Sequence, residues 1–263
     1  MFAPRQKEEQ GKSMKSVLSQ AQIKKQMEEH TDGALRAMRP VPMETDWYHD
    51  YFRRIPFQAL RELLTEARVD LSGKSVHLAG CGNGIDLFYL KQFCKSSFHV
   101  SDISANAVGT VIATDLEVTD SKEDMECLSF EDGAFDWSFT ATSLHHLPRP
   151  ALGVYELLRT SREGVIFIEP QDTWLTRLFV RLGLAQEYEV FGNYVYRWAE
   201  HDVEKLCKSL YYKWHVKQVF ALHGRARNPV EFFLLKTITE ICNFAVPSLG
   251  NYFICMIRKP KDL

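Results

Sequence analysis

The sequence lacks the features that mark a membrane, secreted or nucleic-acid-binding protein. It has no run of 18 apolar residues, the length that a membrane-spanning helix requires. The N-terminal residues contain no apolar signal-peptide core, so we expect a cytoplasmic protein. With 32 Lys and Arg against 34 Asp and Glu, no strong basic charge is available for a nucleic-acid surface, and no nucleic-acid partner is expected.

Cysteine is also scarce. The six cysteines form no C-x-x-C pair and have no zinc-finger spacing, which excludes a disulfide scaffold and a structural zinc module. No group of His, Cys, Asp and Glu has a recognisable metal-ligand spacing, and we therefore expect no essential metal. The cysteines are interpreted as small apolar side chains in a reducing compartment.

Strands alternate with helical patterns through the middle of the chain. Residues 1–45 are polar and predict a flexible extension with a helix near 17–30, while 46–263 form one domain. Within that domain, five short strands between 75 and 169 are separated by helices, the pattern of βαβ units and a mainly parallel sheet. The third of them, at 116–123, is poorly apolar. Two further strands are expected near 214–222 and 251–259.

Helical segments on either side of this region are candidates for covering elements. Residues 47–67 have apolar side chains at helical spacing, and Pro56 predicts either two helices or one kinked helix. Two later segments, 171–200 and 225–250, are rich in aromatic and aliphatic side chains and are expected to act as lid elements. Substrate, a lid core or a homodimer contact would each cover such surfaces.

The most informative stretch is the glycine-rich turn after the first strand. Gly80, Gly82 and Gly84 alternate with Cys81 and Asn83, and a helix is expected to begin at Ile85. Glycines permit positive φ and a close approach of backbone to a ligand, and the following helix directs N–H groups at the turn. A dinucleotide-binding turn needs a third glycine at 85, so the pattern G-x-G-x-G favours a different ligand or an ordinary strand-to-helix connection.

Two carboxylates follow at strand ends. Asp102 ends the second strand, where it can accept hydrogen bonds from a ribose diol or cap the helix that follows; the sequence leaves both open. Asp124 comes after the third strand, and Phe135-Asp136 opens the fourth. The tract Thr142–Pro148, T-S-L-H-H-L-P, follows that strand.

In this order, these motifs resemble those of the class I S-adenosylmethionine-dependent methyltransferases, over about residues 75–170. The resemblance implies a Rossmann-like, doubly wound, seven-stranded α/β sheet that is mostly parallel with an antiparallel last strand. It implies S-adenosyl-L-methionine as the cofactor. The residues that it assigns to the cofactor are Gly80, Cys81, Gly82, Gly84, Asp102, Ile103, Asp124, Met125, Ala141, Tyr48 and Arg54.

The chain departs from the family pattern at two positions. Leu78 stands where the family usually has an acid two residues before the first glycine, and Ser129 stands where proline is common. Leu78 removes one expected contact to the amino group of the cofactor.

The catalytic role is assigned by position alone. His145, His146 and Glu169, with Asp172 close by, lie at strand ends where ligands of open α/β sheets bind, and any of them is a candidate base. A structural role for the histidines and for Glu169 is the competing interpretation.

The expected activity is methyl transfer to an O, N or C atom of a small molecule, in biosynthesis or secondary metabolism. The alternatives are a binding or assembly protein that has lost catalysis and an RNA or protein methyltransferase.

Overall fold

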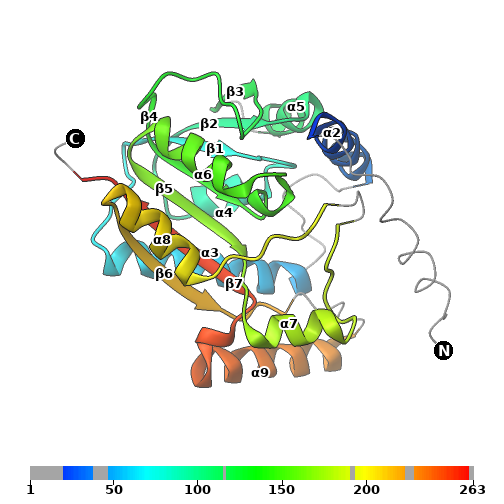
Figure 1. Ribbon diagram of the computed structural model, residues 1–263. Coiled ribbons are helices and arrows are strands. Elements are labelled where there is room, and N and C mark those ends of the chain that lie inside the picture. The colour runs from blue at the N-terminus through cyan, green and yellow to red at the C-terminus, as the bar shows by residue number, and fades with distance from the viewer. Residues whose placement is uncertain (1–19, 38–46, 115–116, 190–192, 223–227, 261–263) are drawn as a thin grey trace.

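The computed structural model describes residues 20–37, 47–114, 117–189, 193–222 and 228–260. Its centre is a seven-stranded sheet in the order β3-β2-β1-β4-β5-β7-β6 (Figure 1). The strands are β1 Ser75–Ala79, β2 Ser97–Asp102, β3 Thr119–Lys122, β4 Phe135–Ala141, β5 Ser161–Pro170, β6 Lys213–Val219 and β7 Tyr252–Arg258.

The direction of the strands confirms the predicted fold class. The five strands from β1 to β5 pair in parallel, whereas β7 pairs antiparallel with both β5 and β6. The strand order reverses between β1 and β4, so the carboxyl ends of β1, β2 and β4 border the crevice at which open α/β sheets bind ligands. β3, with its polar sequence TDSK, lies at the edge, where an exposed strand needs no apolar face.

Helices cover both faces of the sheet. Alternate side chains of β7 divide between two cores: Ile254 and Met256 pack with helices α3 and α4, and Phe253 and Cys255 pack with α6 and α8. This alternation is what a strand buried on both faces requires. The helices with their bounds are α2 Gln20–Ala37, α3 Trp47–Glu66, α4 Ile85–Lys91, α5 Ala105–Thr114, α6 Pro150–Arg159, α7 Trp174–Arg181, α8 Glu200–Leu210 and α9 Pro229–Ala245, with 3₁₀ turns η1 Leu144–His146 and η2 Pro247–Leu249.

The N-terminal helices differ from the sequence-based expectation. α3 is one continuous helix with Pro56 inside it, so of the two alternatives the chain forms a single helix. α2 extends to Ala37, past the expected end at residue 30. Its apolar Met27 is buried in the core beneath α6, which stabilises a helix whose own sequence is polar.

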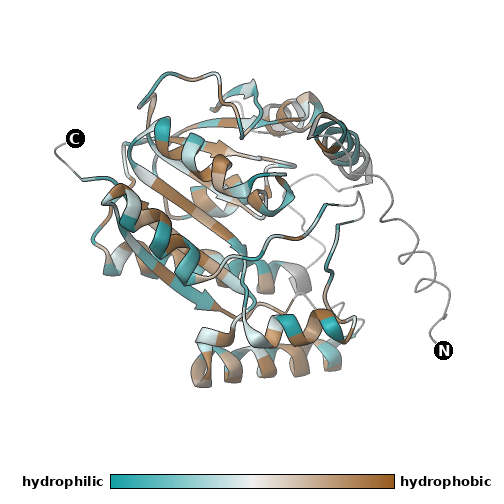
Figure 2. Cartoon of the chain, in the orientation of Figure 1, coloured by the Kyte–Doolittle hydropathy of each residue, from teal (hydrophilic) through white to brown (hydrophobic). Residues whose placement is uncertain are grey.

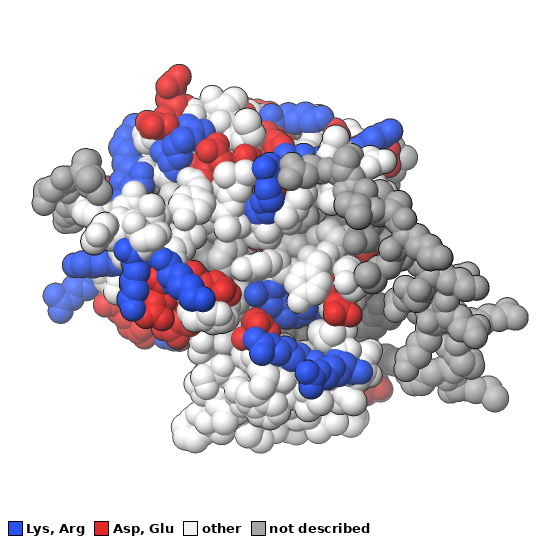
Figure 3. Space-filling model, viewed as in Figure 1, with Lys and Arg blue, Asp and Glu red and all other residues white. Residues whose placement is uncertain are grey.

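The two expected lid segments contain α7 and α9, which lie together at one end of the sheet (Figure 1). Phe232 packs edge-to-face on Tyr51 and Phe52 of α3, while Phe233 and Phe244 are exposed. Figures 2 and 3 show this end of the molecule as apolar and poor in charge compared with the mixed-charge surface elsewhere on the same face. No helix of the described residues is long and apolar enough to cross a membrane.

Candidate active site

The glycine-rich turn has the backbone that its sequence predicts. Gly80, Gly82 and Gly84 all have positive φ, at 70°, 50° and 82°. At Gly80 the space is also closed, because an added Cβ would lie 2.5 Å from Oγ of Ser143. That hydroxyl donates to the carbonyls of Ala141 and Gly80 and so joins the end of β4 to the turn.

Asp102 is tied into the same turn. Its carboxylate accepts the N–H of Gly82 at 3.0 Å and the N–H of Ser104 at 2.9 Å. The first bond holds the glycine turn, and the second positions Ser104, whose hydroxyl accepts the N–H of Ala107 and caps α5. The predicted contact of Asp102 with a ribose stays a prediction. Burial raises the pKa of Asp102, and the backbone N–H groups oppose this rise.

Asp124 is engaged by the N-terminal helix. Nζ of Lys24 on α2 forms ion pairs with Asp124 and with the buried carboxylate of Glu126. The N–H of Glu126 also donates to Asp124, at 3.0 Å. The side chain of Asp124 therefore links α2 to the loop after β3.

These elements enclose a cavity of about 550 Å³ at the carboxyl ends of β1, β2 and β4. This volume lies within the range of small-molecule sites. α2 and α3 close one side, through Met27, His30 and Pro56 among others. The residues predicted for the cofactor that line the cavity are Gly80, Cys81, Gly82, Asp102, Ile103, Asp124, Met125 and Ala141.

Two predicted contacts lie elsewhere. Arg54 is paired with Asp50 on its own helix, and its neighbour Arg53 is the arginine that lines the cavity. Tyr48 belongs to α3, but its side chain lies outside the described residues. Gly84 forms the N-cap of α4 and packs against the side chain of Val111. It shapes the turn and does not itself line the cavity.

Two charged side chains that line the cavity, Asp86 and Arg53, were not predicted from the sequence. Asp86, in the first turn of α4, lines the cavity together with Arg53 and Tyr252. Burial, opposed by Arg53 and assisted by Glu169, raises the pKa of Asp86 to about 7. The signal was an acid two residues after the last glycine, in the helix turn that faces the loop. Its proximity to Arg53 depends on how α3 packs and is not encoded in any short motif.

Glu169 is a structural centre of the turn η1. Its buried carboxylate accepts the N–H groups of Ser143 at 2.9 Å, Leu144 at 2.8 Å and His145 at 3.3 Å. It also contacts Nδ1 of His145 at 2.7 Å. The carboxylate of Glu169 therefore holds both the backbone of η1 and the ring of His145 in place.

His146 is the catalytic candidate that lines the cavity. Burial, together with the neighbouring His145 and His30, lowers the pKa of His146 to about 3. Its imidazole is thus neutral at physiological pH and weakly basic. Asp172, the fourth candidate, is paired with Arg177 of α7.

We expect the Glu169→Gln variant to lose about 2–4 kcal/mol of unfolding free energy, because an amide cannot accept all the bonds that this carboxylate receives. Urea denaturation measures the loss. Glu163→Gln changes a half-buried acid on the same strand that accepts from side chains only, and as the matched control it should change stability less. Equal effects of the two substitutions would contradict a special role for Glu169.

Comparison with known proteins agrees with this geometry. Residues 78–168 match the family model described as a methyltransferase domain. No curated protein matches the chain. The family match and the fold are consistent with a class I S-adenosylmethionine-dependent methyltransferase, and they support S-adenosylmethionine as the cofactor.

Solved structures share this fold at low sequence identity. An S-adenosylmethionine-dependent methyltransferase of Thermotoga maritima is 14% identical, with 92% of this chain and 100% of that chain covered and a TM-score of 0.58. Magnesium protoporphyrin IX methyltransferase of Synechocystis PCC 6803 is 15% identical over 92% and 100%, also at 0.58. A methyltransferase of Mesorhizobium loti is 14% identical over 77% and 96%, at 0.53. At sequence identities this low, the similarity to these structures shows the fold alone.

Proposed function

We propose that the protein transfers the methyl group of S-adenosyl-L-methionine to a small-molecule acceptor. The observation that carries this proposal is the cavity at the switch in strand order, which α2 and α3 close on one side. A cavity of this size, bounded by helices, suits a cofactor and a small acceptor better than a polymer.

The chain offers complementary groups to each part of the cofactor. Asp102 and Ile103 lie at the end of β2, where the ribose and adenine bind in the proposed arrangement, and Met125 extends the apolar wall. The Gly80–Gly84 turn provides the backbone approach, since a side chain at Gly80 would collide with Ser143. When bound, the sulfonium of the cofactor supplies an activated methyl group.

The pair Asp86 and Arg53 suits the zwitterionic methionine end. Arg53 would hold the carboxylate and Asp86 the ammonium, and the bound ammonium would compensate the buried charge of Asp86. Asp86 thereby takes the place of the acid that the family has at position 78, where this chain has Leu78.

The acceptor would lie beside His146, which lines the cavity together with Thr142 and Ser143. Alignment of the nucleophile with the methyl group is the main contribution of such a site, since well-oriented reactants gain roughly 7–11 kcal/mol. The weak basicity of His146 favours an acceptor that reacts without a strong base, such as a neutral amine or an acidic hydroxyl. We propose that α7 and α9 form the lid over the acceptor side.

Titration calorimetry with S-adenosylmethionine and its demethylated product tests the cofactor site. We expect a dissociation constant in the micromolar range, weakened at least tenfold in Asp102→Ala because the turn loses its carboxylate support. Asp132→Ala, an exposed acid outside the cavity, is the control. No binding at millimolar ligand would reject the proposal.

Transfer of labelled methyl groups to an acceptor panel tests the activity. We expect the label to appear in a small molecule and not in the RNA or protein acceptors of the panel. Tight cofactor binding without transfer to any acceptor class would instead favour a binding or assembly protein.

A further inference from the structure

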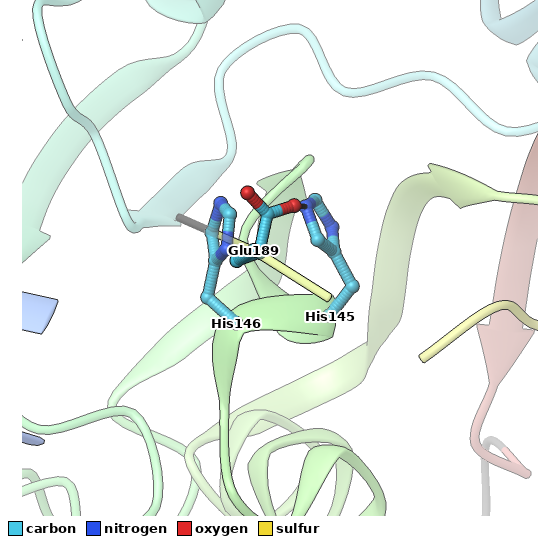
Figure 4. Close-up of side chains that lie close together, drawn as sticks. All are labelled: His145, His146 and Glu189. Carbon is cyan, nitrogen blue, oxygen red and sulfur yellow. Dashed lines mark ion pairs between the residues drawn. The ribbon is translucent and has the colours of Figure 1, made fainter. Parts of the chain in front are cut away.

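Three potential metal ligands meet beside the cavity. The rings of His145 and His146 project from η1, and the carboxylate of Glu189 lies between them (Figure 4). One ligand atom from each residue lies within 4.8 Å of the other two. Nε2 of His145 is 3.7 Å from Oε1 of Glu189. Two imidazoles and one carboxylate are a donor set that Zn²⁺ uses in proteins.

The environment of His145 fixes which of its nitrogens is available. Glu169 already accepts three backbone N–H groups, so its contact with Nδ1 of His145 places the ring proton on that nitrogen. Nε2 then carries the lone pair and faces Glu189. A carboxylate behind a histidine in this way is the usual support of a metal-bound imidazole.

The segment that carries Glu189 is anchored to the turn. Nδ2 of the buried Asn193 donates to the carbonyls of His145 and His146, at 3.1 and 3.2 Å. The N–H of Glu189 in turn donates to the carbonyl of Asn193 at 2.8 Å. The acid is therefore held over both histidines by hydrogen bonds that do not involve its own carboxylate. The side chains of His145 and Glu189 are only 8% and 14% exposed, so the cluster is largely shielded from water.

We propose that His145, His146 and Glu189 form a binding site for a divalent transition-metal ion with the preferences of Zn²⁺. Bonds of 2.0–2.1 Å in a tetrahedron separate ligand atoms by about 3.3 Å, so the ligand atoms need to approach one another by up to about 1.5 Å. The protein supplies three ligands, and a fourth position would remain for water or an acceptor group, next to the cavity that His146 lines.

This proposal departs from the expectation of no metal drawn from the sequence. Adjacent histidines in a turn and an acid far along the chain have no recognisable spacing, and only the fold brings them together. The proposal is independent of the methyltransferase function, because the binding of the metal alone can be measured without cofactor.

Titration of tag-free, metal-free protein with Co²⁺ and Zn²⁺ tests the site. We expect one Co²⁺ per chain with the visible absorption of a four-coordinate ion, displaced by Zn²⁺ with a dissociation constant of roughly 1 µM or tighter. Glu189→Gln and His146→Gln should each weaken binding at least tenfold. Thermal unfolding of both variants without metal establishes that they fold.

Matched controls separate this site from other ligands on the chain. Glu187→Gln changes an acid of the same segment, and His201→Ala removes a partly exposed histidine of α8; both should bind metal as the parent protein does. Absence of binding at 100-fold higher metal, or binding that folded Glu189→Gln and His146→Gln proteins retain in full, would overturn the proposal. In that case the cluster is an ion pair of His145 with two carboxylates.

Discussion

Gly80→Ala is expected to abolish high-affinity cofactor binding and to destabilise the protein by about 2–5 kcal/mol. The substitution places a Cβ on a backbone with φ of 70° and within 2.7 Å of both side-chain atoms of Ser143. Ser143 cannot move away freely, because its hydroxyl is bonded to the carbonyls of Ala141 and Gly80. Chemical denaturation and calorimetry measure the two losses.

Gly183→Ala is the matched control for this variant. Gly183 has the same φ of 70°, but an added Cβ would have no heavy atom within 4 Å. It should therefore show only the conformational cost, about 1 kcal/mol, and unchanged cofactor affinity. If the two variants lose equal stability, close packing at Gly80 is not what requires a glycine there.

Asp86→Asn is expected to weaken cofactor binding by at least tenfold at pH 7.5 and to remove most of its pH dependence. Asp86 has a pKa of about 7 in the free protein, and a bound ammonium would lower it. Below pH 7 the protonated acid must lose its proton on binding, so affinity falls by up to tenfold per pH unit as the pH decreases. Calorimetry between pH 5.5 and 7.5, where an α-amino group stays largely charged, measures this slope.

The same substitution has the opposite effect on the free protein. The pKa of Asp86 is raised in the fold from 3.8 to about 7, so its ionisation costs stability progressively as the pH rises through this interval. Asp86→Asn should therefore raise the melting temperature at pH 7.5 without cofactor. Asp132→Asn, at an exposed position, is the control and should alter neither quantity. A variant that binds the cofactor as before, with the same pH slope, would contradict the role of Asp86.

The sheet was predictable because its signals are local. Each parallel strand is a short apolar run with a turn at its end, and the glycine turn at residues 80–84 marks the first crossover. β3 is the exception, since the sequence TDSK has no strand character of its own. It becomes a strand by pairing with β2, and the family resemblance rather than its composition located it.

The charged groups of the site were less predictable. Glu169 looks like a catalytic base in sequence, but its partners are backbone N–H groups of a turn that the pairing of β4 with β5 places beside it. Arg53 and Arg54 are neighbours on α3, and only the packing of the helix decides which one lines the cavity. The sequence identifies the strand ends at which candidate site residues lie. The role of each side chain there depends on contacts between segments that are distant in the sequence.

The attachment of α2 has a consequence for how fast the cavity exchanges its contents. This helix supplies Met27 and His30 to the cavity wall. Its polar attachments include ion pairs of Lys24 with Asp124 and of Glu28 with Lys122, beside a hydrogen bond from Ser104 to Asp32. Added electrolyte screens such partly exposed pairs. Dissociation of the proposed cofactor should therefore accelerate with ionic strength.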